Sequence, residues 1–394
     1  MKRLFILFLL ISLFGCKKEA PLGYYPVAGE PRFIIPASNL PAETECLASN
    51  NNVGIELFEG RLFVAWRSSE THFASANTKI FVISSADMGK TWEYENTISL
   101  GSDAREPNFL NYNHKLFLYC FKAGTNPVAF EPIDMMVSER LSKGNWTPPE
   151  ANGETQTVPW QLKVHGDYAY MTCYKGSHYS TSSSSSVDVF FKYSSDGRTW
   201  HNVGNREYVY RGGVSEVGYE WDKDGNLWAV TRNEDGDDSG FGSHLVFAPA
   251  SDISAWQFPS ICSRYRYDSP KMFRHGNDLY LVARRSLDGP YDKGMEWLPI
   301  SAQRIEYLAT YSATAKRTAL YKINTEDRSV DWMFDLPGTG DNAFPSVVQT
   351  GEHTFLIANY TSPLDHTDWN WIQGQISPEG TQIYLLELKF EPTF

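Results

Sequence analysis

The stretch "SSADMGKTW", residues 84–92, decides the fold, because a near copy of it occurs elsewhere in the chain. That copy, "SSDGRTW", occupies residues 194–200 and keeps the serine, aspartate, glycine, threonine and tryptophan in the same order. Trp92, Trp146 and Trp200 follow one another at intervals of 54 residues. Such regular spacing predicts a structural unit of roughly 50 residues that repeats along the chain.

Six short segments form a second repeat between the tryptophans. Each has a polar or glycine-containing turn followed by a run of apolar residues, and most end in a charged or aromatic residue. This pattern is typical of a tight turn that leads into a buried β-strand. The segments are "EGRLFVAWR" (59–67), "NHKLFLYCFK" (113–122), "HGDYAYMTCYK" (165–175), "DGNLWAVTR" (224–232), "GNDLYLVARR" (276–285) and "GEHTFLIANY" (351–360).

The two repeats together predict an all-β fold, a six-bladed β-propeller built of four-stranded blades. The tryptophan is expected on the outer strand of each blade. The last unit has no such strand after it, whereas residues 31–37, "PRFIIPA", precede the first unit. We expect this N-terminal segment to complete the last blade and close the ring, which removes an exposed sheet edge. The propeller is expected to span residues 31–394 as one domain.

The N-terminus reads "MKRLFILFLLISLFGC". A short basic region precedes an apolar run, residues 4–14, that is too short to span a membrane as a helix. The run ends at Cys16 in a pattern that resembles the bacterial lipobox. The resemblance implies a signal peptide over residues 1–15, a lipid anchor on Cys16, a tether over residues 16–30, and a location in the bacterial cell envelope.

The overall charge and the missing motifs argue against several classes of partner. The formal net charge of −12 argues against nucleic acid, because phosphate binding requires a basic face. No GxGxxG follows a predicted strand and no P-loop is present, so neither a nucleotide nor a nucleotide cofactor is expected. No CxxC motif or histidine–cysteine cluster indicates a metal site. No cofactor is therefore predicted.

Two sets of polar residues occupy repeated positions in the units. In a propeller the inner strands begin, and the second strands end, on one face near the axis, so both sets are expected to meet there. An apolar run ends in arginine three times, which requires water or a counter-charge at that point. One interpretation is a polar pocket for a ligand; the other is ion pairing that only closes the mouth of the propeller. The first set includes Arg105, Glu216 and Asp268, with Glu106 and Trp160 near it, and the second includes Arg67, Arg232, Arg284 and Tyr360.

Loops that follow the second strands add further candidates on the same face. The segment 68–73 carries Glu70 and His72, and the segment 233–244 carries Glu234. Paired arginine and glutamate side chains in such a pocket would shift each other's pKa, as catalytic sites often require. These three residues complete the predicted site.

Several stretches resemble bacterial members of the sialidase/neuraminidase superfamily, whose propellers carry Asp-box (BNR) repeats. The resemblance rests on "AWRSSETHFASANTKIFVISSADMGKTW" (65–92), "DAREPNF" (103–109), "GGVSE" (212–216), "TRNEDGDDSGFGS" (231–243), "YDSPKMF" (267–273) and "LVARR" (281–285). It implies an exo-glycosidase that acts on a glycan.

The same resemblance implies roles for individual residues. Glu216 and Arg232 resemble the family's glutamate and its second arginine, and Arg284 would stand for the third arginine. Tyr360 would be the nucleophile that Glu216 activates, and Glu70 the general acid/base. Asp268 is a further catalytic candidate.

The sequence departs from the family at the first arginine of its triad. The family has an Arg-Ile-Pro motif there, whereas this chain has "NNNVGIEL" at residues 50–57, and Arg67 would substitute only from another place in the blade. The expected substrate is therefore a glycan rather than sialic acid in particular. A lyase of acidic sugars and a non-catalytic glycan-binding or scaffold propeller remain alternatives, because fold alone does not fix the reaction.

Overall fold

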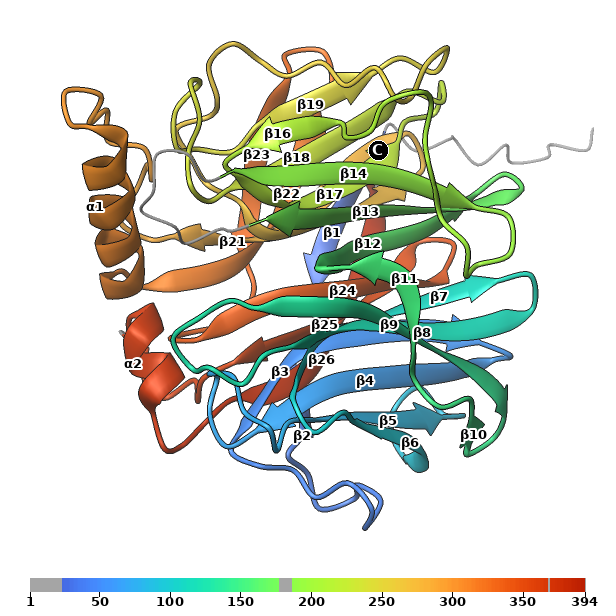
Figure 1. The fold of residues 1–394 in the computed structure, drawn as a ribbon. Helices are drawn as coiled ribbons and strands as arrows, with labels where there is room; N and C mark the ends of the chain where they lie inside the picture. The colour runs from blue at the N-terminus through green and yellow to red at the C-terminus, as the bar shows by residue number, and fades with distance from the viewer. Residues whose placement is uncertain (1–22, 177–185, 368, 394) are drawn as a thin grey trace, which may run out of the picture.

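The computed structural model describes residues 23–176, 186–367 and 369–393. The described strands form six antiparallel sheets, the six blades of a β-propeller (Figure 1). This confirms the predicted all-β architecture. The predicted signal peptide and the lipidation site at Cys16 lie outside the described residues.

The first three blades follow one another in chain order, and in each the inner strand pairs with the second and the second with the third. In blades 2 and 3 the outer position is shared by two short strands, which both pair with the third strand. Blade 1 is β3 (Ser49–Phe58), β4 (Arg61–Ser69), β5 (Lys79–Ser85) and β6 (Glu93–Ser99); blade 2 is β7 (Asp103–Tyr112), β8 (Lys115–Ala123), β9 (Pro132–Ser142), β10 (Asn145–Trp146) and β11 (Glu150–Thr155); blade 3 is β12 (Thr157–His165), β13 (Tyr168–Gly176), β14 (Val187–Ser194), β15 (His201–Asn202) and β16 (Tyr210–Gly212).

Blade 4 departs from the expected four strands. Its described sheet has three, and the outer strand expected at Trp256 is reduced to a single bridge between Phe247 and Gln257. Blade 4 is β17 (Val214–Trp221), β18 (Leu227–Asn233) and β19 (Leu245–Ala248); blade 5 is β20 (Asp268–His275), β21 (Asp278–Ser286), β22 (Lys316–Asn324) and β23 (Ser329–Asp335); blade 6 contains β24 (Asn342–Gly351), β25 (Thr354–Thr361) and β26 (Gln382–Thr393).

N-terminal strands complete blade 6 and close the ring, as predicted. β2 (Arg32–Ile35), from the predicted closing segment, pairs with β26. β1 (Gly23–Ala28) also pairs with β26, along six residues. Residues 23–28 had been assigned to the tether, but they are a strand, because the long C-terminal strand offers an edge that both segments cover.

The repeated turn that decided the fold has a structural role. The Asp87 carboxylate accepts hydrogen bonds from the backbone N–H groups of Lys90 and Thr91, at 3.0 and 2.8 Å, and from the Thr91 hydroxyl at 2.7 Å. Asp196 accepts the equivalent bonds in blade 3. These bonds lower the pKa of Asp87. Each turn delivers a buried tryptophan to the space between blades.

Every inner strand contains a β-bulge near the axis. Residues with positive φ stand at four of these bulges, and Glu106 is one of them, with φ of 56°. A bulge re-aims side chains and often lies beside a functional site. Close approach of the strands at the axis also requires glycine: a Cβ on Gly54 would lie 2.4 Å from the carbonyl oxygen of Pro107. The bulges therefore turn inner-strand side chains, Glu106 and Glu216 among them, toward the axis.

In the described part of the chain, two helices interrupt the all-β pattern and lie together at one side of the propeller, at the left in Figure 1. α1 (Ile300–Ala313) connects β21 to β22, and α2 (Trp371–Ile376) connects β25 to β26. Neither was predicted. Among the described residues no helix is both long enough and apolar enough to cross a membrane.

Candidate functional site

A cavity of about 370 Å³ lies where the six blades meet. All six blades contribute to its lining, and both helices add residues to its rim. Six of the twelve predicted site residues line it: His72, Arg105, Glu106, Glu216, Arg232 and Arg284.

Glu106 and Glu216 are two buried carboxyl groups of this cavity, 7% and 1% exposed. Glu216 accepts hydrogen bonds from Arg232 Nη1 at 2.6 Å and from the backbone N–H of Ser269 at 2.9 Å. Within the described part of the chain, Oε2 of Glu106 has no hydrogen-bond partner. Burial and the nearby Glu216 raise the pKa of Glu106 well above its ordinary value. Burial also raises the pKa of Glu216, although Arg232 opposes the shift.

Arg232 lies at the centre of a group of carboxylates. It forms ion pairs with Glu216 at 2.6 Å, with Glu234 at 2.5 Å and with Asp268 at 3.0 Å. Asp268 forms a second ion pair, with Arg266, at 2.6 Å. We call Arg232 and its three carboxylates the Arg232 cluster. Because carboxylates outnumber arginines here, the cluster is the acidic side of the site.

A second group, which we call the Arg67 cluster, contains Arg67, Asp103 and Arg105. The guanidinium of Arg67 donates to Asp103 Oδ1 at 3.1 and 2.9 Å, and Arg105 donates to the other carboxylate oxygen. Burial alone would raise the pKa of Asp103, but the two arginines hold it below its ordinary value. Burial lowers the pKa of Arg67 to about 10.

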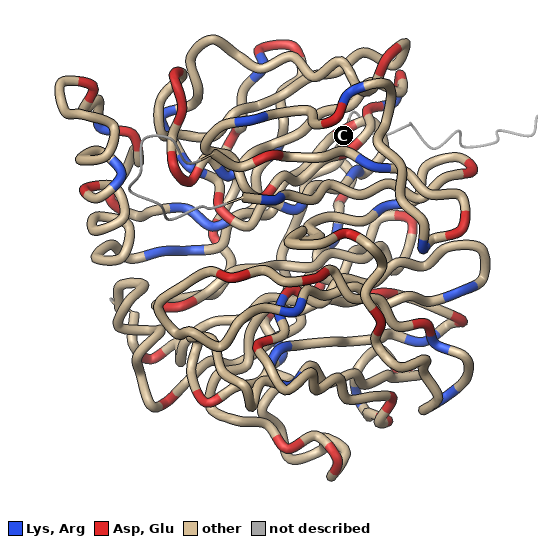
Figure 2. The backbone as a smooth tube through the Cα atoms, in the orientation of Figure 1, with Lys and Arg blue, Asp and Glu red and all other residues tan. Residues whose placement is uncertain are grey.

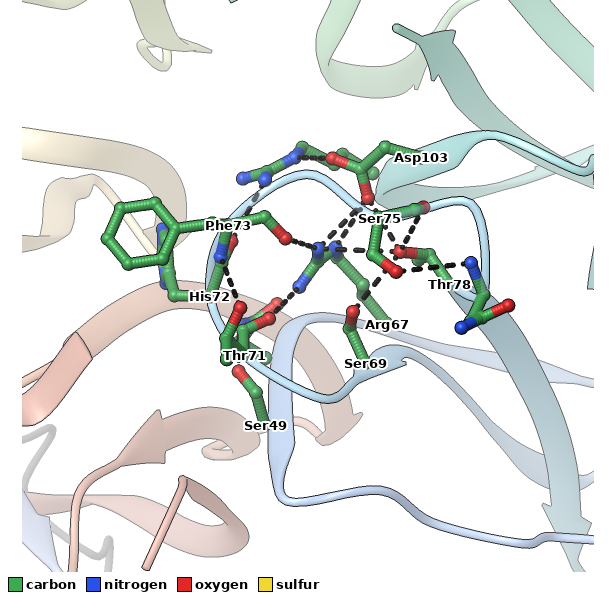
Figure 3. Close-up of polar contacts among 12 residues, drawn as sticks. Ser49, Arg67, Ser69, Thr71, His72, Phe73, Ser75, Thr78 and Asp103 are labelled. Carbon is green, nitrogen blue, oxygen red and sulfur yellow. Dashed lines mark hydrogen bonds and ion pairs between the residues drawn. The ribbon is translucent and has the colours of Figure 1, made fainter. Parts of the chain in front are cut away.

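The same two arginines bind three consecutive carbonyl groups of the loop after β4 (Figure 3). Arg67 donates to the carbonyl oxygens of Thr71 at 3.3 Å and Phe73 at 2.9 Å. Arg105 donates to that of His72 at 2.9 Å. Arg67 is fully buried and does not line the cavity, so it fixes the loop that carries His72.

His72 is bound to a carboxylate that the sequence analysis did not identify. Its Nδ1 lies 2.6 Å from Asp341 Oδ2, and the hydroxyl of Tyr360 donates to Asp341 Oδ1 at 2.9 Å. Tyr360 is fully buried, and the ring of Phe344, which does line the cavity, lies 6.2 Å from it. Burial and the Asp341 charge raise the pKa of Tyr360 well above its ordinary value. Tyr360 therefore does not occupy the position of a nucleophile in this cavity.

Arg284 differs from the other arginines of the cavity. It donates to the backbone carbonyl of Asn342 at 2.7 Å and lies between the rings of Tyr311 and Trp371, 5.5 and 5.7 Å from their centres. No carboxylate among the described residues forms an ion pair with Arg284, and its Nε has no hydrogen-bond partner there. Arg284 thus lines the cavity without a direct ion pair, although it is 1% exposed and lies within electrostatic reach of Asp268.

Two further predicted residues lie away from the cavity lining. Trp160 is 1% exposed, donates its indole N–H to the carbonyl of Pro270, and packs under Lys271 at 4.3 Å, so it offers no face to a sugar. Glu70 is exposed and accepts a hydrogen bond from Asn77 at 2.7 Å, chief among the bonds that lower its pKa. The predicted residues behind the lining are Arg67, Glu234, Asp268 and Tyr360.

The residues that sequence reasoning missed follow a detectable pattern. Asp103 and Asp341 each stand four residues before a proline at an inner-strand bulge, in the form D-x-x-x-P, as "DAREP" and "DNAFP". This shared spacing would have predicted two carboxylates at the same level of blades 2 and 6, which lie on either side of blade 1. Nothing in the strand repeats predicts the helix residue Tyr311, because it belongs to an insertion between strands.

Comparisons with known proteins agree with the fold. A crystal structure of a protein of unknown function from Dyadobacter fermentans matches with a TM-score of 0.59 and 14% identity, covering 93% of this chain and 99% of that one. Trypanosoma rangeli sialidase in complex with sialic acid matches with a TM-score of 0.53 and 13% identity, covering 92% of this chain and 58% of that chain. A mutant of the same sialidase with trans-sialidase activity has a TM-score of 0.54 at 12% identity. No protein-family model and no curated protein matches.

Proposed function

We propose that the protein is a glycoside hydrolase whose catalytic centre is the cavity at the propeller axis. The observation that carries this proposal is the unequal environment of Glu106 and Glu216. Both carboxyl groups are buried in one cavity, but within the described ranges donors are found only on the oxygens of Glu216. Glycoside hydrolysis uses two carboxyl groups of this kind, one protonated and one ionised.

The two glutamates take different roles. Glu106 keeps its proton, because burial and the neighbouring Glu216 raise its pKa, and it donates that proton to the oxygen of the leaving group. The ionised form of Glu216 is favoured by the Arg232 guanidinium and the Ser269 N–H, so its charge stabilises the positive charge that develops on the sugar ring.

The charges of the cavity limit the substrate. Arg232 and Arg105 form ion pairs with carboxylates, whereas Arg284 forms none with the residues that the structure describes. This supports a neutral sugar or one with a single acidic group, placed against Arg284. Phe344 and Trp371 line the same cavity and provide aromatic surface for the apolar face of a sugar ring. The likeness to a sialidase that binds sialic acid supports a glycan substrate, and three arginines free for one carboxylate are not found in this cavity.

The experiment is a panel of aryl glycosides and natural oligosaccharides, neutral and acidic, tested on the purified protein and on Glu106→Gln. If Glu106 is the acid, the variant should lose about 100-fold or more in kcat/KM on substrates with a poor leaving group. A dinitrophenyl glycoside needs no protonation, so its turnover should fall much less. Glu70→Gln, an exposed carboxyl outside the cavity, is the matched control and should behave as wild type.

Three results would contradict the proposal. Equal losses on good and poor leaving groups would remove Glu106 from the role of acid. Binding of glycans without turnover of any substrate, measured by calorimetry, would identify the protein as a glycan-binding propeller instead. An unsaturated product that absorbs in the ultraviolet would show that the enzyme is a lyase and not a hydrolase.

The lipid anchor at Cys16 is part of the proposal. The apolar run before Cys16 supports export and anchoring in the bacterial cell envelope. Cys16→Ser should abolish labelling by a radioactive fatty acid and move the protein from the membrane fraction to the soluble fraction. Cys46→Ser, which changes a cysteine inside the propeller, is the matched control.

A further inference from the structure

The cavity contains a proton-transfer group that the two glutamates do not account for. His72 lines the cavity, and its side chain is 14% exposed, whereas Asp341, which holds its Nδ1, is fully buried. The exposed edge of the ring is therefore the one that carries Nε2. No described residue forms a hydrogen bond with this nitrogen, which leaves it open to a water molecule or a substrate.

The contact with Asp341 determines which ring nitrogen carries the proton. A carboxylate 2.6 Å from Nδ1 accepts a hydrogen bond, so the neutral ring carries its proton on Nδ1 and its lone pair on Nε2. The second oxygen of Asp341 accepts from the Tyr360 hydroxyl. Tyr360 thus orients the carboxylate, and the carboxylate orients the imidazole.

The position of His72 is fixed from its backbone as well. Arg105 holds its carbonyl oxygen, and Arg67 holds the carbonyls on either side. The ring of Trp371 lies 6.2 Å from the imidazole in an edge-to-face arrangement. A surface loop ordinarily moves, but this one is bound at three consecutive residues, which is the support that a catalytic side chain requires.

We propose that His72 is the general base of the cavity, with Asp341 as its positioning residue and Tyr360 acting only through Asp341. This inference rests on the proposed function, for which it supplies the group that activates water. Glu216 is poorly suited to that task, because donors already occupy both of its oxygens.

Nε2 of His72 takes a proton from water, and the water oxygen forms a bond to the anomeric carbon. The glycosidic C–O bond breaks, its electron pair goes to the leaving oxygen, and that oxygen takes the proton of Glu106. The imidazolium then returns its proton to solvent while Glu106 regains one, so the net change is the addition of one water molecule. The configuration at the anomeric carbon inverts.

The charges around His72 suit a base. Burial lowers its pKa, as do the nearby Arg105 and Arg67, while Asp341 raises it. His72 is therefore neutral at pH 7 and becomes protonated only at lower pH. The kcat/KM of the wild type should fall on the acidic side as His72 takes up its proton, and on the alkaline side as Glu106 loses its own.

The test compares His72→Gln, His72→Ala, Asp341→Asn and Tyr360→Phe on the best glycoside of the panel. His72→Gln should lose about 100-fold or more in kcat and also lose the acidic limb of the pH profile. His72→Ala should regain activity when imidazole is added. Asp341→Asn should lower kcat and move the acidic limb to lower pH, because the charge that raises the pKa of His72 is gone. Tyr360→Phe should lose less than about tenfold.

The controls separate this inference from the proposed function. His201→Gln removes an exposed histidine of β15 and should behave as wild type. If Glu106→Gln is inactive while His72→Gln keeps its rate and its acidic limb, the inference fails and the proposed function stands. An inverted product, followed by NMR, supports His72 as the base, and a retained configuration overturns it. If the wild type cleaves no glycoside, both fail together.

Discussion

The Arg67 cluster and the Arg232 cluster approach one cavity but differ in the balance of their charges. In the first, two arginines share the single carboxylate of Asp103, and their remaining donors bind backbone carbonyls. In the second, Arg232 contacts three carboxylates, of which Asp268 is also paired with Arg266. Figure 2 shows acidic and basic positions interspersed along the strands, so this local imbalance does not follow from a segregation of charge over the whole molecule.

This difference in charge balance distinguishes a cluster that supports the structure from carboxyl groups that can take part in chemistry. Surplus arginine lowers the pKa of Asp103, which therefore stays charged and holds its partners in place. The Arg232 cluster is mixed, because Arg266 and Arg232 hold the pKa of Asp268 below its ordinary value in spite of burial. Burial raises the pKa of Glu216 in the same cluster, and burial and the charge of Glu216 raise that of the nearby Glu106. A carboxyl group with a raised pKa is able to exchange a proton near neutral pH. The comparison therefore predicts that mutations in the two clusters will have different consequences.

The largest expected effect is on stability, for Arg67→Met. This change leaves Asp103 buried with one of its two arginines and releases the carbonyls of the loop that carries His72. Breaking a buried ion pair costs about 3 to 5 kcal/mol, so we expect a decrease of that size in the free energy of unfolding, measured by urea denaturation. The control is Arg211→Met, which removes a pair of similar geometry at the surface and should change stability far less. If Arg67→Met lost as little stability as the control, the Arg67 cluster would not stabilise the fold.

Much of the propeller could be predicted because its features repeat along the chain. The tryptophan turns and the apolar strands recur in most units, so each copy strengthens the interpretation of the others. Glu216 and Arg232 were found together because they occupy equivalent places on adjacent strands of one blade. The N-terminal strand β1 was missed because its role depends on the edge of β26, which lies more than 350 residues away in sequence.

The rest of the site could not be predicted, because it depends on contacts in space that the repeated positions in the sequence do not reveal. Trp160 and Tyr360 occupy the expected positions, but the bulges and the ring of Phe344 decide which side chains reach the cavity. Arg67 was predicted to bind substrate because arginine at the end of an apolar run needs a partner. Its partner is Asp103, and the sequence does not distinguish a buried carboxylate from a ligand.

A second, smaller effect is expected for Glu106→Gln, and here the stability should increase. The pKa of Glu106 is raised in the folded protein, so this group favours folding at pH below its unfolded pKa and loses that contribution as the pH rises through the folded value. Glutamine does not ionise. The variant should therefore gain stability relative to wild type as the pH rises, by about 1 to 2 kcal/mol at pH 8, the scale of an unsatisfied buried group. Denaturation at pH 5 and pH 8 measures the difference.

A difference between Glu106→Gln and wild type that does not change with pH would contradict this reasoning. It would mean that Glu106 ionises normally in the fold, and the acidic character assigned to the cavity would be lost. A gain in stability together with a loss of activity would instead support the view that the site is maintained at a cost to the fold.

The smallest expected effect is for Arg105→Lys, and it tests whether the Arg67 cluster positions His72. Arg105 donates to Asp103 and to the carbonyl of His72 at once, which the single ammonium of lysine does less well. Asp103 keeps its bonds to Arg67, so the free energy of unfolding should fall by only about 1 kcal/mol. The kcat should fall by about tenfold or less, the equivalent of 1.4 kcal/mol. Because Arg105 also lines the cavity, the kinetic constants must be separated: poorer positioning lowers kcat, whereas a lost contact with substrate raises KM. A raised KM with unchanged kcat would assign Arg105 to substrate binding and leave the loop to Arg67 alone.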